Sequence, residues 1–329
     1  MNNTKNSQKF NSRRSVSARN FILGRSFLDL SIAGLLLLAL GSQAHADTLT
    51  LYAYPSPTGI NWSSPNTLAW STIASMLVSD RELHSIHPIG HMNLDLKCEN
   101  SSHLPHGARI MTGQTSMSSE QEKSEIFKEG YGLEVFLTPV SGRWETQAEI
   151  EADLPIREQR GSMAFIEFTI APKTCARVVK YLNEYKARGF DKIYGGLEDR
   201  PRYREGAGCS AFAEGVLEVA GLMDPIWTNY FRHHVNVPNA LLGGPSGRNI
   251  PFTDLLFGLD SFEWNESIRN SYALDFWDPY YAYYWIQQAA VKPLLLQKFK
   301  YQPTKKVNAP GIAIDARNAL TPTDPFFLN

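Results

Sequence analysis

Cysteine is scarce in this chain of 329 residues, which contains only Cys98, Cys175 and Cys209. In an oxidising compartment an odd number of cysteines leaves at least one thiol free or paired with another molecule. The sequence also lacks internal repeats and low-complexity tracts. Its hydrophobic content of 43% is sufficient for a sizeable core. We therefore expect an ordinary folded chain with one elaborated domain or two small ones.

The chain has no excess of basic residues. The first 46 residues contain six basic residues and one acidic residue, so the remainder carries 26 basic and 32 acidic residues, a net charge of −6. A mildly acidic domain with scattered charges has no electrostatic footprint for nucleic acid. Nucleic acid is therefore not an expected partner.

A long uninterrupted hydrophobic run is missing too. The apolar stretch of residues 27–40 contains Asp29 and is short for a membrane span. It follows a basic region and precedes the small-x-small sequence Ala44-His45-Ala46, which is typical of a signal-peptide cleavage site. We expect residues 1–46 to be a signal peptide, and a mature protein that begins at Asp47, lacks a stable membrane span and is periplasmic or secreted.

Two short segments in a fixed order carry most of the functional information. Residues 90–96, Gly-His-Met-Asn-Leu-Asp-Leu, alternate as a strand that His91 opens. Residues 206–212, Gly-Ala-Gly-Cys-Ser-Ala-Phe, read as a turn that leads into a helix. A cysteine in the first turn of a helix lies near the positive end of the helix dipole, which favours the nucleophilic thiolate. Cys209 is thus a candidate nucleophile and His91 a candidate base, although a buried inert cysteine and a structural histidine are the simpler interpretations.

The rest of the pattern predicts an α+β fold. A charged segment at residues 145–160 is either a short helix or a mobile loop. Residues 224–329 are rich in proline and aromatic residues, and they either wrap around the core at 47–223 or form a subdomain. The expected strands are 47–54, 90–98, 108–115, 132–140 and 163–170, and the expected helices are 64–79, 173–188, 209–221, 252–259 and 279–296.

The predicted elements also favour one disulfide. Cys98 ends the histidine strand, and Cys175 opens the helix that follows another strand. If this strand and helix pack together, the two cysteines can pair, and Cys209 remains the free thiol. The alternative is that all three cysteines are reduced.

The order of these elements resembles the circularly permuted NlpC-type papain-like cysteine hydrolases, the group of YiiX-like and lecithin-retinol-acyltransferase-like proteins. In that group the histidine strand precedes the cysteine helix. The matching positions are Gly90-His91, Cys209-Ser210 and Tyr194, and the resemblance covers about residues 85–221. It implies a papain-like fold with an antiparallel sheet and the nucleophile at a helix N-terminus.

The resemblance also implies roles. Cys209 would attack a carbonyl, and His91 would move the proton. The group supplies a third polar residue from the strand after the histidine strand. For a hairpin centred near residue 102, this gives Gln114 as the candidate and Thr112 as the alternative, with Glu167 as a further polar residue. The backbone N–H of Cys209 would stabilise the oxyanion, with Tyr54 as a possible second donor.

An exported enzyme of this type would cleave an amide bond in cell-wall peptides. The alternatives are a lipid esterase or acyltransferase and a non-catalytic envelope protein that binds peptide or lipid. No cofactor is expected. The spacing of His84, His87 and His91 suits a metal, but Pro88 and Gly90 interrupt any helix that would align them, so we expect no metal site.

Overall fold

A computed structural model describes residues 46–79, 87–100, 108–117, 124–125, 128–244, 247–258, 263–264 and 268–329. The predicted signal peptide up to residue 45 lies outside these residues, and so does His84. Within the described part of the chain, no helix combines the length and the apolar character that crossing a bilayer requires.

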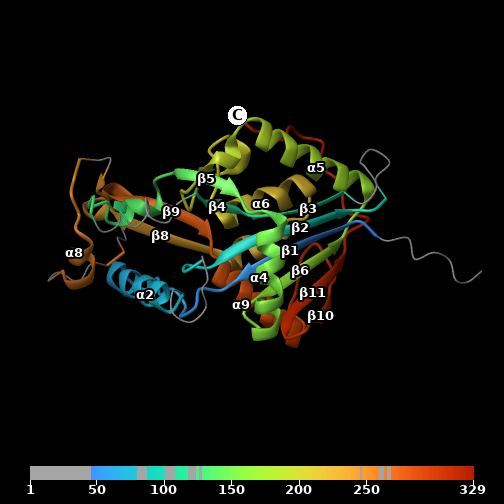
Figure 1. Cartoon of the computed structure of the whole chain (residues 1–329), viewed down its shortest axis with the longest axis horizontal. Coiled ribbons are helices and arrows are strands. Elements are labelled where there is room, and N and C mark those ends of the chain that lie inside the picture. The colour runs from blue at the N-terminus through green and yellow to red at the C-terminus, as the bar shows by residue number, and fades with distance from the viewer. Residues whose placement is uncertain are drawn as a thin grey trace, which may run out of the picture. The chain divides into compact units, whose positions relative to one another are not determined.

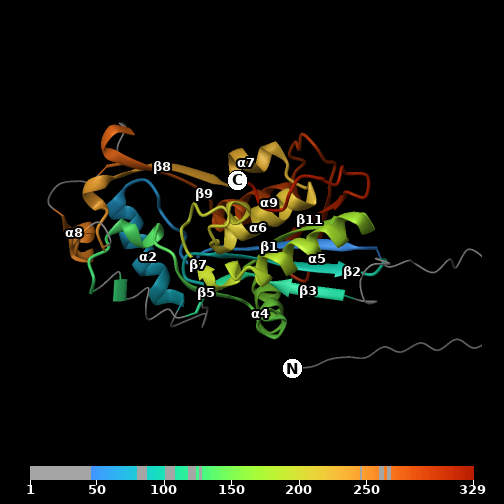
Figure 2. The same ribbon diagram turned by 90° about the horizontal axis from the view of Figure 1, so that it is seen from above.

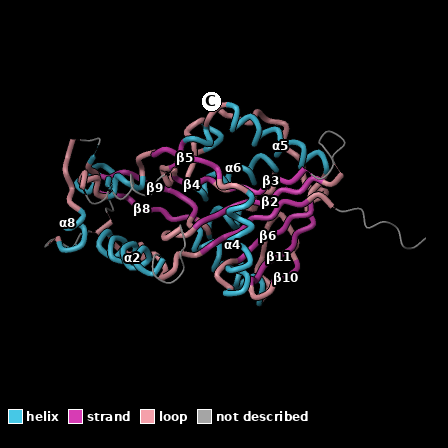
Figure 3. Tube along the Cα trace, viewed as in Figure 1, coloured by secondary structure: helices cyan, strands magenta, loops and turns pink. Residues whose placement is uncertain are grey.

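A six-stranded sheet forms the centre of the fold (Figures 1 and 3). Its strands, in spatial order, are β10 (Gln302–Lys306), β11 (Ala309–Asp315), β6 (Ala164–Thr169), β1 (Thr48–Tyr54), β2 (His91–Cys98) and β3 (Ala108–Thr112). All neighbours are antiparallel except β11 and β6, which run parallel. In the central pair, Tyr54 lies opposite His91. The sheet and its helices confirm the predicted α+β class.

The two faces of this sheet pack against different helices. Leu49 and Leu51 of β1 belong to the largest hydrophobic core, whereas Tyr52 and Tyr54 belong to a smaller one, as alternation along a strand requires. Figure 2 shows α4 on the opposite side of the strands from α6 and α9. The helices that contribute residues to the larger core are α5 (Pro172–Ala187), α6 (Cys209–Ala220), α7 (Pro225–Tyr230) and α9 (Pro279–Val291), and α4 (Gln147–Arg160) covers the other face.

A separate core lies beside the β8–β9 ribbon. The antiparallel ribbon consists of β8 (Arg232–Pro238) and β9 (Ser271–Trp277), and it packs with α2 (Pro65–Val78), α8 (Phe252–Phe257) and a 3-10 helix at Leu133–Phe136. A small sheet of β4 (Gln114–Ser116), β5 (Val140–Trp144) and β7 (Ile193–Tyr194) completes the strands. Further 3-10 helices are Phe190–Lys192, Pro201–Tyr203, Asn239–Leu241 and Ile268–Asn270.

Helix boundaries agree with the sequence where a capping signal marks them. Ser64 accepts a hydrogen bond from the backbone N–H of Thr67 at the start of α2, and Gly221 ends α6 in the left-handed conformation. The charged segment predicted at residues 145–160 is the helix α4. The strand predicted at residues 132–140 is wrong, because a 3-10 helix occupies Leu133–Phe136 and the strand begins only at Val140.

Cys98 and Cys175 form a disulfide between the end of β2 and the first turn of α5. Their Cα atoms are 5.9 Å apart, within the range that a disulfide requires. This placement confirms the predicted pairing. Cys209 is the free cysteine and is buried.

The C-terminal third of the chain contributes directly to the main sheet. β11 pairs with β6, and β10 pairs with β11, so residues 302–315 extend the sheet that carries His91. α9 packs against β1, β6 and β11. The segment after residue 224 therefore provides one edge of the main sheet and part of the larger hydrophobic core.

Candidate active site

Cys209 is the first residue of α6, and the residue is 8% exposed. The N-cap is Gly208 and provides no side-chain hydrogen bond to the helix start. The first N–H groups of a helix have no partner within the helix, so the positive end of the helix dipole faces the thiol. This position favours a thiolate at Cys209.

The structure brings Cys209 and His91 together, although 118 positions separate them in the sequence. The imidazole of His91 and the backbone N–H of Met92 lie close enough to the sulfur of Cys209 to favour its thiolate. The start of β2 therefore provides both a side-chain and a backbone contact for the cysteine.

Glu145 holds the other side of the His91 ring. Nε2 of His91 donates to Oε2 of Glu145 over 2.6 Å, and both side chains are buried. Since Nε2 bonds to Glu145, Nδ1 is the ring nitrogen left for the thiol of Cys209. The resulting series of thiol, imidazole and carboxylate has the geometry of a nucleophile, a base and the group that orients the base.

A break in the third strand gives Glu145 access to His91. β3 ends at Thr112, and the backbone N–H of Glu145 donates to the carbonyl of Gly113 over 2.8 Å. A Cβ at Gly113 would lie 2.3 Å from Oε2 of Glu145 and 3.1 Å from Nε2 of His91. Only glycine leaves enough space here for the carboxylate to reach the imidazole.

The structure does not bring Gln114 to His91. Its amide nitrogen donates to the carbonyls of Asp191 and Ile193 over 2.8 and 2.9 Å. After Gly113 the chain leaves β2 and pairs instead with β5, so the register that places Gln114 opposite His91 does not continue. The prediction that Gln114 lies beside the imidazole of His91 is therefore wrong, and Glu145 occupies that position.

The other polar candidates also have different partners. Thr112 donates to the backbone carbonyl of Glu145 over 3.3 Å, so it supports the carboxylate residue rather than the imidazole. Glu167 lies 3.7 Å from Nζ of Lys306. Tyr54 exchanges hydrogen bonds with Asn93, and its ring lies against His91 with centroids 6.0 Å apart. The hydroxyl of Tyr54 is thus engaged with Asn93.

His87 is a further component that the sequence interpretation did not place in the site. Its ring stacks on His91, with centroids 3.6 Å apart and an angle of 3° between the planes. Nε2 of His87 donates to Oε1 of Glu145 over 3.1 Å. Both carboxylate oxygens of Glu145 therefore accept a hydrogen bond from an imidazole.

The electrostatics favour a charged cysteine and histidine. Burial raises the pKa of Cys209, but the positive charge of His91 and the hydrogen bonds from His91 and Met92 outweigh it, so the pKa lies below the usual thiol value. Burial lowers the pKa of His91, whereas Glu145 and Cys209 raise it, and the net direction is upward. Burial and the charge of His91 lower the pKa of His87 to about 4, so His87 is neutral near pH 7.

His87, His91 and Glu145 are also the only group in the described residues whose donor atoms could hold a metal ion. These atoms lie within 4.8 Å of one another, and two imidazoles with a carboxylate are a common zinc ligand set. A metal on Nε2 of His91 would replace its hydrogen bond with Glu145. The same residues therefore support either a metal or the Cys209–His91–Glu145 series.

Removing metal from the protein distinguishes a metal site from a Cys209–His91–Glu145 active site. We expect dialysis against EDTA to leave the rate of Cys209 alkylation by iodoacetamide unchanged, because the hydrogen-bonded series needs no ion. Added Zn²⁺ should slow alkylation by binding the His91 group. Mass spectrometry of the alkylated peptide measures both rates, and an increase of reactivity in EDTA that Zn²⁺ reverses would favour the metal site.

Comparisons with family models, curated proteins and solved structures found no match to this chain.

Proposed function

We propose that the protein is a cysteine hydrolase that transfers an acyl group to Cys209 and then to water. The observation that carries this proposal is the buried thiol of Cys209 beside His91, whose imidazole is hydrogen-bonded to the buried carboxylate of Glu145. A permuted papain-like fold agrees with the α+β architecture and with the order of the histidine strand and the cysteine helix. The substrate bond is an amide or an ester.

The chemistry follows from the positions of these groups. The thiolate of Cys209 attacks the carbonyl carbon, and the N–H groups at the start of α6 stabilise the negative oxygen. The His91 imidazolium then protonates the leaving amine or alcohol as its bond to the acyl carbon breaks, which leaves a thioester on Cys209. His91 next takes a proton from water, the hydroxide attacks the thioester, and the carboxylic acid and the thiol are released.

The resemblance supports an amide bond of cell-wall peptides as the substrate, and the alternative is an ester or amide of a lipid. Cys98 and Cys175 lie at disulfide distance, which agrees with an oxidising compartment and with export through the N-terminal segment. A non-catalytic binding protein would not need the arrangement of carboxylate, imidazole and thiol.

The direct test is labelling and turnover at Cys209. We expect iodoacetamide to alkylate Cys209 faster than an unperturbed thiol at pH 7, and p-nitrophenyl acetate to be hydrolysed with an initial burst. Cys209→Ala should abolish both signals while the circular dichroism spectrum is unchanged. Equal turnover by Cys209→Ala would contradict the proposal.

Glu145→Gln should reduce turnover about 10- to 1000-fold, because the amide keeps the shape of the side chain but removes the charge that stabilises the imidazolium. The measurement is kcat for p-nitrophenyl acetate together with the pH profile. Gln114→Ala is the matched control for a buried polar residue outside the Cys209–His91 pair, and it should change kcat much less. A profile unchanged by Glu145→Gln would remove Glu145 from the reaction.

A further inference from the structure

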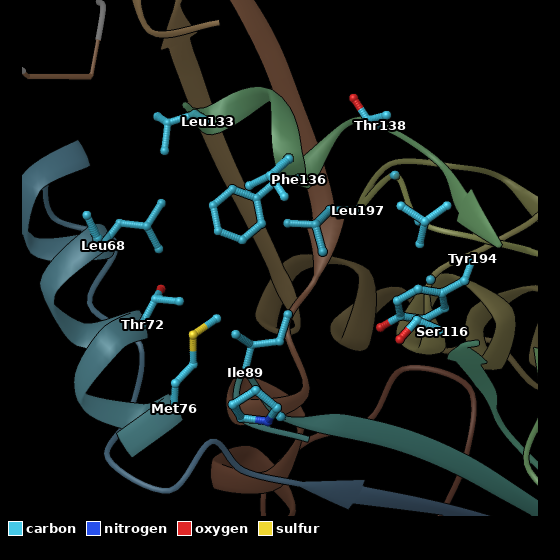
Figure 4. Close-up of a pocket in the computed structure, with 18 of the residues that line it drawn as sticks. Leu68, Thr72, Met76, Ile89, Ser116, Leu133, Phe136, Thr138, Tyr194 and Leu197 are labelled. Carbon is cyan, nitrogen blue, oxygen red and sulfur yellow. The ribbon is translucent and has the colours of Figure 1, made fainter. Parts of the chain in front are cut away.

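An apolar pocket lies beside the candidate active site, between α2 and the 3-10 helix at Leu133–Phe136. Figure 4 shows Leu68, Thr72 and Met76 projecting from α2 toward Ile89, Phe136 and Leu197. No Asp, Glu, Lys or Arg side chain lines the pocket among the described residues. Its one histidine, His87, already donates a hydrogen bond to Glu145.

The pocket shares part of its lining with a smaller hollow that contains Cys209. The smaller hollow contains Cys209 and Ser210, and it shares Leu68, Ile89 and Phe136 with the larger pocket. The single acidic residue of the smaller hollow, Asp278, already pairs with His233 over 3.0 Å and caps α9. An extended group attached to the sulfur therefore meets an apolar surface on its way toward α2.

We infer that this pocket binds the apolar acyl chain of the substrate, so that Cys209 becomes acylated by a fatty acyl group from an ester or an amide. The inference rests on the proposed acyl transfer at Cys209. Cell-wall peptides carry carboxylates and amines. The pocket lining has no charged side chain to pair with these groups, so binding them there would incur the cost of removing them from water. A hydrocarbon chain has no such cost, and its transfer from water is favourable.

The size of the pocket limits the length of the chain. Its volume is about 140 Å³. Apolar cavities of about 150 Å³ take up molecules the size of benzene, which has six carbons. We therefore expect the affinity to increase over about the first six carbons of the acyl chain and then to level off.

The test is a series of p-nitrophenyl esters from acetate to octanoate. Each buried methylene should raise kcat/KM roughly fourfold up to hexanoate. Met76→Asp places a charge in the pocket wall and should lower the ratio of hexanoate to acetate turnover at least tenfold. Leu77→Asp is the matched control, because the neighbouring residue of α2 is 50% exposed and does not line the pocket. The corresponding p-nitroanilides show whether an amide or an ester is preferred.

The outcomes separate this inference from the proposed function. Hydrolysis of acetate by Cys209 without any gain from longer chains would overturn the acyl-chain pocket and leave the hydrolase intact. If no ester is hydrolysed, titration of the Cys209→Ala protein with hexanamide decides whether the pocket binds the chain, and absence of binding overturns the inference. If Met76→Asp does not fold, Val135→Asp introduces the charge at a half-buried position of the same wall.

Discussion

Replacing His91 with alanine should reduce the alkylation of Cys209 by about two orders of magnitude at pH 6. In the native protein the charge of His91 and its hydrogen bond keep the pKa of the thiol below the usual value, whereas burial acts in the opposite direction. Without His91, burial dominates, and the pKa of the Cys209 thiol rises. At pH 6 even an unperturbed thiol, with a pKa of about 8.5, is only about 0.3% thiolate.

The rate of Cys209 labelling should depend on pH differently in the native protein and in His91→Ala. The native thiol should stay reactive at a lower pH than ordinary cysteine, and its reactivity should decline only as the thiolate is protonated. In turnover, the upper limb should lie well above pH 6.5, because the pKa of His91 is raised and its imidazolium persists. The measurement is the rate of iodoacetamide labelling from pH 4 to pH 10. His234→Ala is the matched control, since this histidine is 70% exposed, and equal profiles for His91→Ala and the native protein would remove His91 as the partner of the thiol.

Gly113→Ala should reduce turnover nearly as much as the loss of the Glu145 charge and should also destabilise the fold by about 1–3 kcal/mol. The added Cβ would lie 2.3 Å from Oε2 of Glu145 and 2.8 Å from Cβ of Asn93, so the carboxylate or the strand has to move. Turnover of p-nitrophenyl acetate and urea unfolding measure the two effects.

Gly189→Ala provides the control for the loss of stability alone. Gly189 has a φ of +77°, and an added Cβ there contacts no atom within 4 Å, so the substitution strains the backbone without touching the site. It should lower the free energy of unfolding and leave turnover unchanged. If Gly113→Ala has full activity, contact between Glu145 and His91 is not needed for the reaction.

The elements next to the nucleophile could be predicted because their signals are local. Gly208 and Gly221 bound the Cys209 helix, and alternation defines β2. The strand predicted at residues 132–140 was wrong because Gly132 has a φ of +59°, outside the extended region, and the 3-10 helix starts directly after it. Alternating apolar residues alone did not reveal that turn.

Glu145 was missed for a different physical reason. Extending the hairpin register from Cys98 and Ala108 toward His91 assumes a continuous strand, and the strand stops before Gly113. Glu145 instead directly follows β5, a strand that is distant in sequence from His91 and pairs with β4. The local signal was the capping box of Thr146 and Glu149, which fixes the helix start directly after Glu145 but does not show what Glu145 contacts.

The parallel pairing of β11 with β6 has a consequence for how the chain folds. Phe165 and Ile166 of β6 pair with Gly311 and Ile312, which are synthesised much later. Until then this edge of β6 has unpaired backbone groups and apolar side chains, and such edges recruit other chains. Contacts between distant segments also slow folding. We therefore expect chains that stop before β11 to aggregate, and the complete protein to refold slowly from denaturant.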